Sequence, residues 1–422
     1  MASEPIDHDP LRRRISKACL GGMLLSLSPS MHAAVLGARE GTTRKLPAWV
    51  RALTTRQWSQ VAGTALASSP ALYVWPGGRA PGRPSGIVDA WGGWAVDEAT
   101  NRIWLQGGGH SDYGGNELYM LDLRADAPTW SLAVEPTPLE SLTRLIDGRI
   151  HSKWNKDGTP VAAHIYWSAH FVGGRIYRTP YYADFGAIEA GRHAFAPNNE
   201  AWLPAFDTVG RKWDAPDAHA LLPNYSSSDP GSGGIAYAPC CSDGERYYAV
   251  LLDRSVMKYR LCCYDPTGNV WEAIGDASVP PIRTGGTFPG SIYDSRRREL
   301  VLIGEKSDVI VQRYDLDSGE RRISARTGVE FARTWDSSYS GVCYDRLRDK
   351  YYLYSGRANA DKNLYVIDPA AGYKVSVMSE LRSTQLPLSA AGVNSRFKYI
   401  QDYDLLLMQP TYDSNLWALR LS

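Results

Sequence analysis

Apolar residues in this chain come in short blocks rather than at helical spacing. Along residues 86–422 they either alternate with polar residues or run together briefly, and Gly, Pro, Asn or Asp bounds each block. Alternation and short apolar runs are typical of strands, whereas an amphipathic helix repeats its apolar positions every three or four residues. The 14 Trp, 25 Tyr and 39 Gly also favour strands and turns. The pattern predicts an all-β protein.

The blocks form a repeating unit of four strands. Each unit has an apolar strand A, a turn, a strand B that ends in a loop, a strand C near an Asp, and a short strand D that often carries Trp. The first strands begin near residues 94, 164, 235, 291, 341 and 397. Such a repeat predicts a β-propeller, a ring of four-stranded blades. Six blades are recognisable, and a seventh stays open.

The last unit lacks its fourth strand. Residues 57–61, Gln-Trp-Ser-Gln-Val, provide a strand of the missing kind, with Trp58 in the usual place. A ring closed by strands from both termini leaves no long sheet edge exposed. We therefore expect the N-terminal strand to complete the last blade.

The first residues read as an export signal. Residues 12–17, Arg-Arg-Arg-Ile-Ser-Lys, precede the apolar run 18–27, and Ala33 and Ala34 follow. This order resembles a twin-arginine signal. An ordinary secretory signal is the alternative, and a membrane anchor is disfavoured because the apolar run is short. We assign residues 1–34 to the signal, 35–85 to an N-terminal segment with the closing strand, and 86–422 to the propeller.

The net charge limits the classes of molecule that the protein is expected to bind. The formal net charge of the 422 residues is +1, so no global field attracts nucleic acid or a membrane surface. Once its signal is removed, we expect a periplasmic or secreted monomer that does not bind membranes. Any selectivity for charged ligands must be local.

One glycine-rich run stands out between two predicted strands. Residues 107–116 read Gly-Gly-Gly-His-Ser-Asp-Tyr-Gly-Gly-Asn, so five glycines surround His110. Glycine adopts backbone conformations closed to other residues, and such a run can turn sharply or let another group approach closely. We predict that the run presents the imidazole at the rim of a sheet. A glycine-rich hairpin with a solvated histidine is the alternative.

The propeller frame sorts the polar residues by face. Loops between strands B and C and between D and A emerge on one face, the loop face, and the A–B and C–D turns on the other, the turn face. The loop face is predicted to gather His, Tyr and Arg, with Asp112 orienting one of these bases. The members are His110, Tyr113, Asn116, His164, Tyr225, Arg254, Arg333, Tyr339 and Arg357. A cationic, aromatic-lined site suits an acidic sugar.

The other histidines are weaker candidates for a functional role. His170 aligns with the middle of a strand and is predicted to pack in the core, and His151, His193 and His219 are given no role.

The cysteines occur as two adjacent pairs in the third blade. Cys240–Cys241 falls at its A–B turn and Cys262–Cys263 at the end of its strand C, which places both on the turn face. Export favours a disulfide. Free thiols and a metal site are the alternatives, although adjacent cysteines do not have the usual zinc spacing.

With the blades and the glycine run together, the chain resembles a kelch-type propeller. Within that group it resembles the propeller polysaccharide lyases that cleave ulvan, a sulfated uronate polymer. The resemblance implies that His110, His164 and Tyr225 are catalytic and that Arg254 binds substrate. Members of that family have seven blades, against the six counted here.

The residue types fit β-elimination from a uronate. The reaction needs the carboxylate neutralised, the C5 proton removed and the leaving oxygen protonated. Arg254 can pair with the carboxylate, a histidine can act as base, and a tyrosine can donate to the leaving oxygen or share the base role. Tyr113, Asn116, Arg333, Tyr339 and Arg357 are expected to contact the rest of an acidic polysaccharide, sulfated or not. No cofactor is required, and a structural calcium or zinc ion is compatible with the sequence.

Two other interpretations stay open. A copper radical oxidase on a kelch propeller needs a cysteine beside the site tyrosine, and here the cysteines are predicted on the other face. A secreted propeller that binds glycans or proteins without catalysis needs an aromatic platform without convergent His and Arg, because fold alone does not determine function.

Overall fold

The computed structural model describes most of the chain beyond the predicted signal. The described ranges are residues 45–109, 112–142, 154–178, 200–201, 203–223, 225–226, 238–278, 290–303, 310–325, 327–328, 340–356, 362–378, 381–382, 387–389 and 392–422. The chain divides into the units Met1–Lys45 and Leu46–Ser422, and every element named below belongs to the second. Within the described ranges, no helix is long and apolar enough to cross a membrane.

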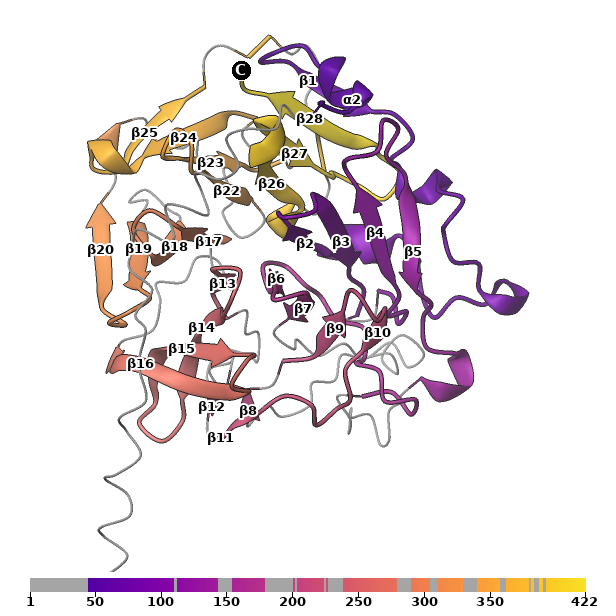
Figure 1. The fold of residues 1–422 in the computed structure, drawn as a ribbon, viewed down its shortest axis with the longest axis horizontal. Coiled ribbons are helices and arrows are strands. Elements are labelled where there is room, and N and C mark those ends of the chain that lie inside the picture. The colour runs from indigo at the N-terminus through magenta and orange to yellow at the C-terminus, as the bar shows by residue number, and fades with distance from the viewer. Residues whose placement is uncertain are drawn as a thin grey trace, which may run out of the picture. The chain divides into compact units, whose positions relative to one another are not determined.

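Antiparallel four-stranded sheets are arranged as the blades of a propeller (Figure 1). The prediction of six blades is confirmed, with an extra strand on the third and fifth. Blade 1 is β2 (Gly93–Asp97), β3 (Arg102–Gln106), β4 (Leu118–Asp122) and β5 (Trp130–Val134). Blade 2 is β6 (Ala169–Val172), β7 (Arg175–Arg178), β9 (Ala205–Asp207) and β10 (Lys212–Trp213). Blade 3 is β12 (Tyr225–Ser226), β13 (Cys240–Ser242), β14 (Tyr247–Asp253), β15 (Lys258–Asp265) and β16 (Val270–Ser278).

The remaining blades follow the same order. Blade 4 is β17 (Gly290–Asp294), β18 (Glu299–Ile303), β19 (Ile310–Asp315) and β20 (Arg321–Ala325). Blade 5 is β21 (Thr327–Gly328), β22 (Gly341–Asp345), β23 (Lys350–Tyr354), β24 (Leu364–Asp368) and β25 (Lys374–Val377). Blade 6 is β26 (Phe397–Ile400), β27 (Leu405–Met408), β28 (Leu416–Arg420) and β1 (Trp58–Val61).

Among the residues that the structure describes, helical structure is limited to short turns around the blades. Two further strands, β8 (Glu200–Ala201) and β11 (Leu222–Pro223), pair with each other in a separate two-stranded sheet. The helices are α2 (Ala48–Arg51), α3 (Gly86–Asp89) and the 3-10 turns η3 (Leu66–Ser68), η4 (Pro76–Gly78), η5 (Leu139–Ser141), η8 (Pro369–Ala371), η9 (Asn394–Arg396) and η10 (Gln401–Tyr403).

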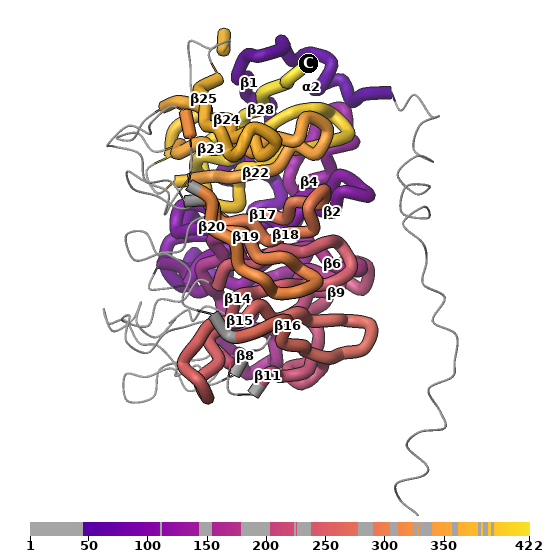
Figure 2. The backbone as a smooth tube through the Cα atoms, turned by 90° about the vertical axis from the view of Figure 1, so that its left-hand side faces the viewer, coloured from indigo at the N-terminus to yellow at the C-terminus, as the bar shows by residue number. Residues whose placement is uncertain are grey.

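The ring is closed by strands from both ends of the chain, as predicted. β1 pairs antiparallel with β28, and Trp58 lies opposite Leu419 in the register. The two strands lie side by side in both views (Figures 1 and 2). Successive side chains of a strand point to opposite faces, so Trp58 packs between blades 5 and 6 while Val61 packs between blades 6 and 1. The closing strand therefore contributes to two blade interfaces.

The apolar core is divided among the interfaces between consecutive blades. One cluster joins blades 1 and 2 through Trp104 and Phe206, and another joins blades 4 and 5 through Val301 and Leu353. Strand B of each blade is buried on both sides, and all five residues of β18 are buried. Because each blade covers its neighbours, the strands read as continuous apolar blocks in the sequence.

The turn face is built from a repeated aspartate turn. The side chain of an Asp at a strand end accepts hydrogen bonds from the backbone amides two and three residues later. This turn recurs at Asp97, Asp207, Asp243, Asp265, Asp294, Asp315, Asp345 and Asp368. This turn explains why an Asp recurs at strand ends in the sequence repeat.

Arginines in these turns connect neighbouring blades. Arg297 bonds Asp294 of its own blade at 2.8 Å and also makes a two-pronged contact with Asp349 of blade 5, at 2.7 and 2.8 Å. Arg348 repeats the arrangement from Asp345 to Asp404 of blade 6. The hydrogen bonds from Arg297 hold the pKa of Asp349 below its ordinary value, although burial opposes them.

The predicted disulfide is wrong for the cysteines that the structure describes. Cys240, Cys241, Cys262, Cys263 and Cys343 are buried free thiols. The two pairs lie inside β13 and β15 rather than in the A–B turn, and β14 runs between those strands. Adjacent residues of a strand face opposite ways, so Cys240 and Cys262 pack toward blade 2 while Cys241 and Cys263 pack toward blade 4.

We predict that Arg297→Gln lowers the free energy of unfolding by about 2–4 kcal/mol at neutral pH, because it leaves the fully buried Asp294 carboxylate without its cation. The neighbouring Arg298 forms an exposed pair with Asp317, so Arg298→Gln should cost less than about 1 kcal/mol. Denaturant unfolding of both variants measures the difference. Asp349 has a lowered pKa, so its share of the loss should disappear as the pH falls through that pKa. Equal losses for the two variants would contradict the role of the inter-blade contact.

Candidate functional site

The glycine run forms the loop between β3 and β4 on the loop face. Gly108 has a φ of +100°, which favours glycine, and a Cβ on Gly107 would lie 2.1 Å from the backbone oxygen of Ile87. The loop is pinned to the preceding segment because Arg83 N donates to Asp112 O at 2.9 Å and Gly114 N donates to Pro81 O at 2.7 Å. The glycines therefore allow a close-packed, sharply turned loop, as the sequence predicts.

A buried polar network lies under this loop. Tyr113 is fully buried, and its hydroxyl donates to Glu117 Oε1 at 2.5 Å while accepting from Trp75 Nε1 at 2.9 Å. Burial raises the pKa of Glu117 to about 7, against the opposing effect of the Tyr113 hydrogen bond. Tyr113 was expected to contact substrate, but a buried ring whose hydroxyl is engaged in this network anchors the loop instead.

Asn116 is also an anchor rather than a surface group. Its side chain is 1% exposed, and its amide nitrogen donates to Pro160 O at 2.9 Å and to Thr159 Oγ1 at 2.9 Å. Its amide oxygen accepts from Thr137 N at 2.8 Å. These bonds tie the glycine loop to the segment that leads into His164. The predicted substrate contact of Asn116 is therefore replaced by a structural role.

Asp112 joins the glycine loop to His164. Asp112 Oδ2 lies 3.4 Å from His164 Nε2, and Asp112 Oδ1 lies 3.2 Å from Arg83 Nη2. Burial raises the pKa of Asp112, but the hydrogen bonds and charges of His164 and Arg83 outweigh it and leave the pKa below its ordinary value. The carboxylate is thus held ionised beside His164, and a role for Asp112 in orienting a base stays a prediction.

Aromatic rings enclose His164. Its imidazole is 0% exposed and lies 4.6 Å from the Trp91 ring, and its Nδ1 is 3.5 Å from the Tyr166 hydroxyl. The Trp91 and Tyr166 rings are stacked at 5.6 Å. His164 and Tyr166 are buried, whereas Trp91 is half-buried. His164 therefore lies beneath the loop face, and Asp112 and Trp91 lie between it and the surface.

Tyr225 and Arg254 lie together in blade 3. Tyr225 is opposite Asp253 in the pairing of β12 with β14, and its hydroxyl donates to Asp253 Oδ2 at 3.0 Å. Asp253 also accepts from Arg260 Nε at 3.1 Å. Burial, followed by nearby negative charge, raises the pKa of Tyr225 to about 12. Arg254 follows in the B–C turn and is exposed, so both residues lie on the predicted face.

Several predicted residues cannot be placed. His110, Arg333, Tyr339 and Arg357 lie outside the described residues. His170 is on β6 as predicted, but its side chain lines a cavity rather than a closed core.

Two residues near the site were missed by the sequence analysis. Trp91 precedes β2 and stacks against the His164 segment, yet nothing in the local sequence distinguishes it from the structural tryptophans. Arg178 ends β7 and is 2% exposed, with Nη2 donating to Val161 O at 2.7 Å. Its Nε and Nη1 have no hydrogen-bond partner within the described part of the chain, and the guanidinium lies 5.5 Å from the centre of the Trp213 ring. Burial lowers its pKa to about 9. Its position at the end of a strand B was the available signal.

The described residues hold no group of three or more His, Cys, Asp or Glu side chains placed to bind a metal ion.

Comparisons with known proteins give only distant structural likenesses. No protein-family model and no curated protein matches the chain. A structure of a Bacteroides thetaiotaomicron protein of unknown function is 11% identical, covers 86% of this chain and 74% of its own, and has a TM-score of 0.45. TolB from Acinetobacter baumannii is 9% identical, covers 78% and 62%, and scores 0.35. Oligogalacturonate lyase from Vibrio parahaemolyticus is 8% identical, covers 77% and 95%, and scores 0.34.

We predict that Glu117→Gln makes the protein more stable than the wild type above pH 7. The raised pKa means that the folded wild type keeps the Glu117 proton between about pH 4.5 and pH 7 while the unfolded chain releases it, so stability falls across that interval. The amide cannot ionise and should gain about 3 kcal/mol relative to the wild type at pH 8, at roughly 1.4 kcal/mol per pKa unit.

Urea unfolding at several pH values measures this difference. Glu135→Gln changes an exposed carboxylate and should leave the wild-type pH dependence intact. Parallel pH profiles for Glu117→Gln and the wild type would show that Glu117 is ionised at neutral pH.

Proposed function

We propose that this protein is an exported lyase that cleaves a uronate-containing polysaccharide by β-elimination on the loop face. One observation carries the proposal. The contact of 3.4 Å between Asp112 and His164 joins the glycine loop that holds His110 to the segment that holds the second predicted histidine. Two distant imidazole-bearing segments thus meet at one carboxylate on the face where propellers present their loops.

His110 is the proposed base and His164 the residue that positions it. The His164 ring is fully buried, so it acts through Asp112 rather than by touching the sugar. Asp112 is two residues from His110 and is held ionised by His164 and Arg83. A fixed carboxylate near an imidazole favours the protonated ring that forms once the base has taken a proton.

The proposed elimination balances without a cofactor. His110 takes the C5 proton, the C5–H electrons form the C4–C5 double bond, and the C4–O bond breaks toward the leaving sugar. Tyr225 has a pKa of about 12 and is protonated at neutral pH, so it suits the acid that protonates the leaving oxygen and not the base. Arg254, exposed beside it, is proposed to pair with the uronate carboxylate.

The remaining assignments complete the proposal. Arg333, Tyr339 and Arg357 are proposed to bind neighbouring sugars of the polymer. The protein is proposed to act as a monomer in the periplasm or outside the cell, without a catalytic metal and without nucleic acid or membrane partners.

A glycan-binding propeller without catalysis is the second candidate. It is favoured by the half-buried Trp91, which offers an aromatic ring on the loop face, and by the burial of His164. Aromatic rings stack on sugar faces without any need for an acid or base.

The test is the ultraviolet absorbance of the unsaturated uronate product across a panel of acidic polysaccharides. On the polymer that is cleaved, His110→Ala should lower turnover by about 10²–10⁴-fold, as expected for a lost general base. His164→Gln should lower turnover and shift the pH profile of kcat, because it removes the imidazole that holds Asp112 ionised. Tyr225→Phe should lower kcat, and Arg254→Gln should raise KM.

Arg211→Gln serves as the matched control for Arg254, because Arg211 is also exposed but lies in a turn of the opposite face. Binding of a polymer by affinity electrophoresis without any unsaturated product would establish the binding propeller instead. Full activity in His110→Ala would overturn the proposed base. An unchanged pH profile in His164→Gln would reduce His164 to a structural residue.

A further inference from the structure

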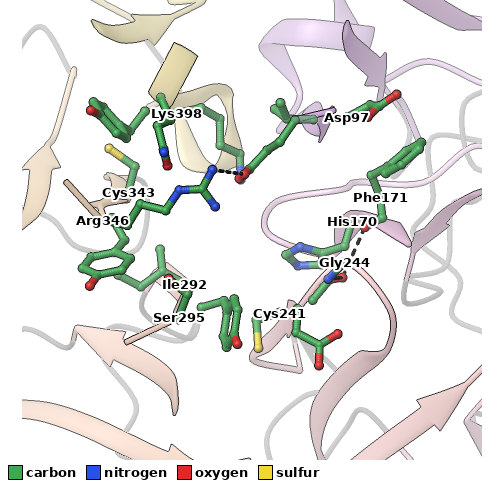
Figure 3. Close-up of a pocket in the computed structure, with 18 of the residues that line it drawn as sticks. Asp97, His170, Phe171, Cys241, Gly244, Ile292, Ser295, Cys343, Arg346 and Lys398 are labelled. Atoms are coloured by element: carbon green, nitrogen blue, oxygen red, sulfur yellow. Dashed lines mark hydrogen bonds and ion pairs between the residues drawn. The ribbon is translucent and has the colours of Figure 1, made fainter. Parts of the chain in front are cut away.

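A separate cavity lies at the turn-face end of the central channel. Its volume is about 360 Å³. The strands that line it are the innermost strands of the six blades, β2, β6, β13, β17, β22 and β26, together with their A–B turns. Figure 3 shows side chains from all sides of the ring directed into this space. The cavity shares no residue with the candidate lyase site.

The carboxylates around the cavity are already satisfied. Asp97 caps its own turn by accepting from Ala99 N at 3.0 Å, and Asp243 does the same for Arg246 N at 2.8 Å. Glu98 pairs with Arg346 at 3.3 Å. Backbone hydrogen bonds and the Arg346 ion pair thus hold these carboxylates in the turns. Glu98 still acts on Lys398 through space and raises its pKa, against the larger effect of burial.

Lys398 is the cation that lacks a partner. It lies on β26, is half-buried, and has no hydrogen bond or ion pair with any described residue. Burial lowers the pKa of its ammonium group. Removing an ammonium group from water without a partner is costly, and the cost is offset when an anion binds beside it.

His170 faces the same space from β6. Its Nε2 is buried and has no hydrogen-bond partner among the described residues. Burial and the charge of Lys398 lower the pKa of His170 to about 3, against the opposing effect of hydrogen bonds to the backbone of Trp167 and Cys240. The ring is therefore neutral at pH 7, and one of its nitrogens carries a proton. Figure 3 shows the imidazole and the Lys398 side chain both directed into the cavity.

We propose that this cavity binds a small organic monocarboxylate, with Lys398 neutralising its charge, His170 Nε2 donating to its second oxygen, and its apolar body against Val96, Ile292 and Val342. Lys398, the one cation of the described cavity lining without an ion pair, matches a single negative charge. A phosphate dianion would keep one charge uncompensated. The volume is at the lower end of small-molecule pockets, roughly 300–1,000 Å³, which suits a ligand of one ring. The proposal stands independently of the lyase activity.

Benzoate is a suitable probe because it joins one carboxylate to a compact apolar ring. Isothermal titration of the full chain should show one benzoate per protein, and neutral benzamide should not bind. Lys398→Met should weaken benzoate binding by about 10–100-fold, as expected for a lost hydrogen bond to a charged group. His170→Phe should weaken it by about tenfold.

Two controls separate binding from folding. Lys398→Met removes a half-buried charge that has no ion pair among the described residues, so its melting temperature should equal or exceed that of the wild type. Lys374→Met removes an exposed lysine of β25 and should bind benzoate like the wild type. The proposal is overturned if the wild type does not bind benzoate, if folded Lys398→Met binds it as tightly as the wild type, or if inorganic phosphate binds more tightly than benzoate.

Discussion

The pairing of β1 with β28 is the constraint on which the rest of the molecule depends. It joins Trp58–Val61 to Leu416–Arg420, although more than 350 residues separate the two strands in the sequence. Trp58 and Val61 are each 3% exposed, and burying a large apolar side chain stabilises a fold by about 1.5–3 kcal/mol. Without this pairing, β28 would present an open edge and two blade interfaces would lose part of their core.

The two faces of the closed ring differ in how regular their connections are. On the turn face, aspartate turns repeat from blade to blade, and Arg297 and Arg348 connect neighbouring turns. On the loop face, the connections differ from blade to blade, and the glycine loop of blade 1 is held by its own network of Tyr113 and Glu117. A regular frame on one face thus supports connections on the other that differ from blade to blade.

Much of the fold could be predicted from the sequence because blades repeat. The apolar blocks located the strands, and the missing fourth strand of the last unit identified residues 57–61 as the closing strand. The cysteine prediction failed because residue spacing does not show that β14 lies between the two pairs. Adjacent side chains of a strand face opposite ways, so the two cysteines of each pair belong to opposite blade interfaces.

The candidate site was only partly predictable. The pairing of Asp112 with an imidazole followed from its place in the glycine loop. By contrast, Tyr113 and Asn116 are polar residues in a loop, and their burial depends on Trp75, Thr137 and Pro160, which come from other segments. The unpaired Lys398 has the same origin, because its surroundings are assembled from all six blades. Contacts between distant segments set these environments, and no local pattern records them.

Native-state hydrogen exchange tests the closure most directly. If the ring is one cooperative unit, the hydrogen-bonded amides of β1 and β28 should exchange with the same opening free energy as those of β27, which has a strand on each side. Amides of β1 that exchange orders of magnitude faster than those of β27, with no change in global stability, would show that the N-terminal strand frays independently. That result would contradict closure by the two termini.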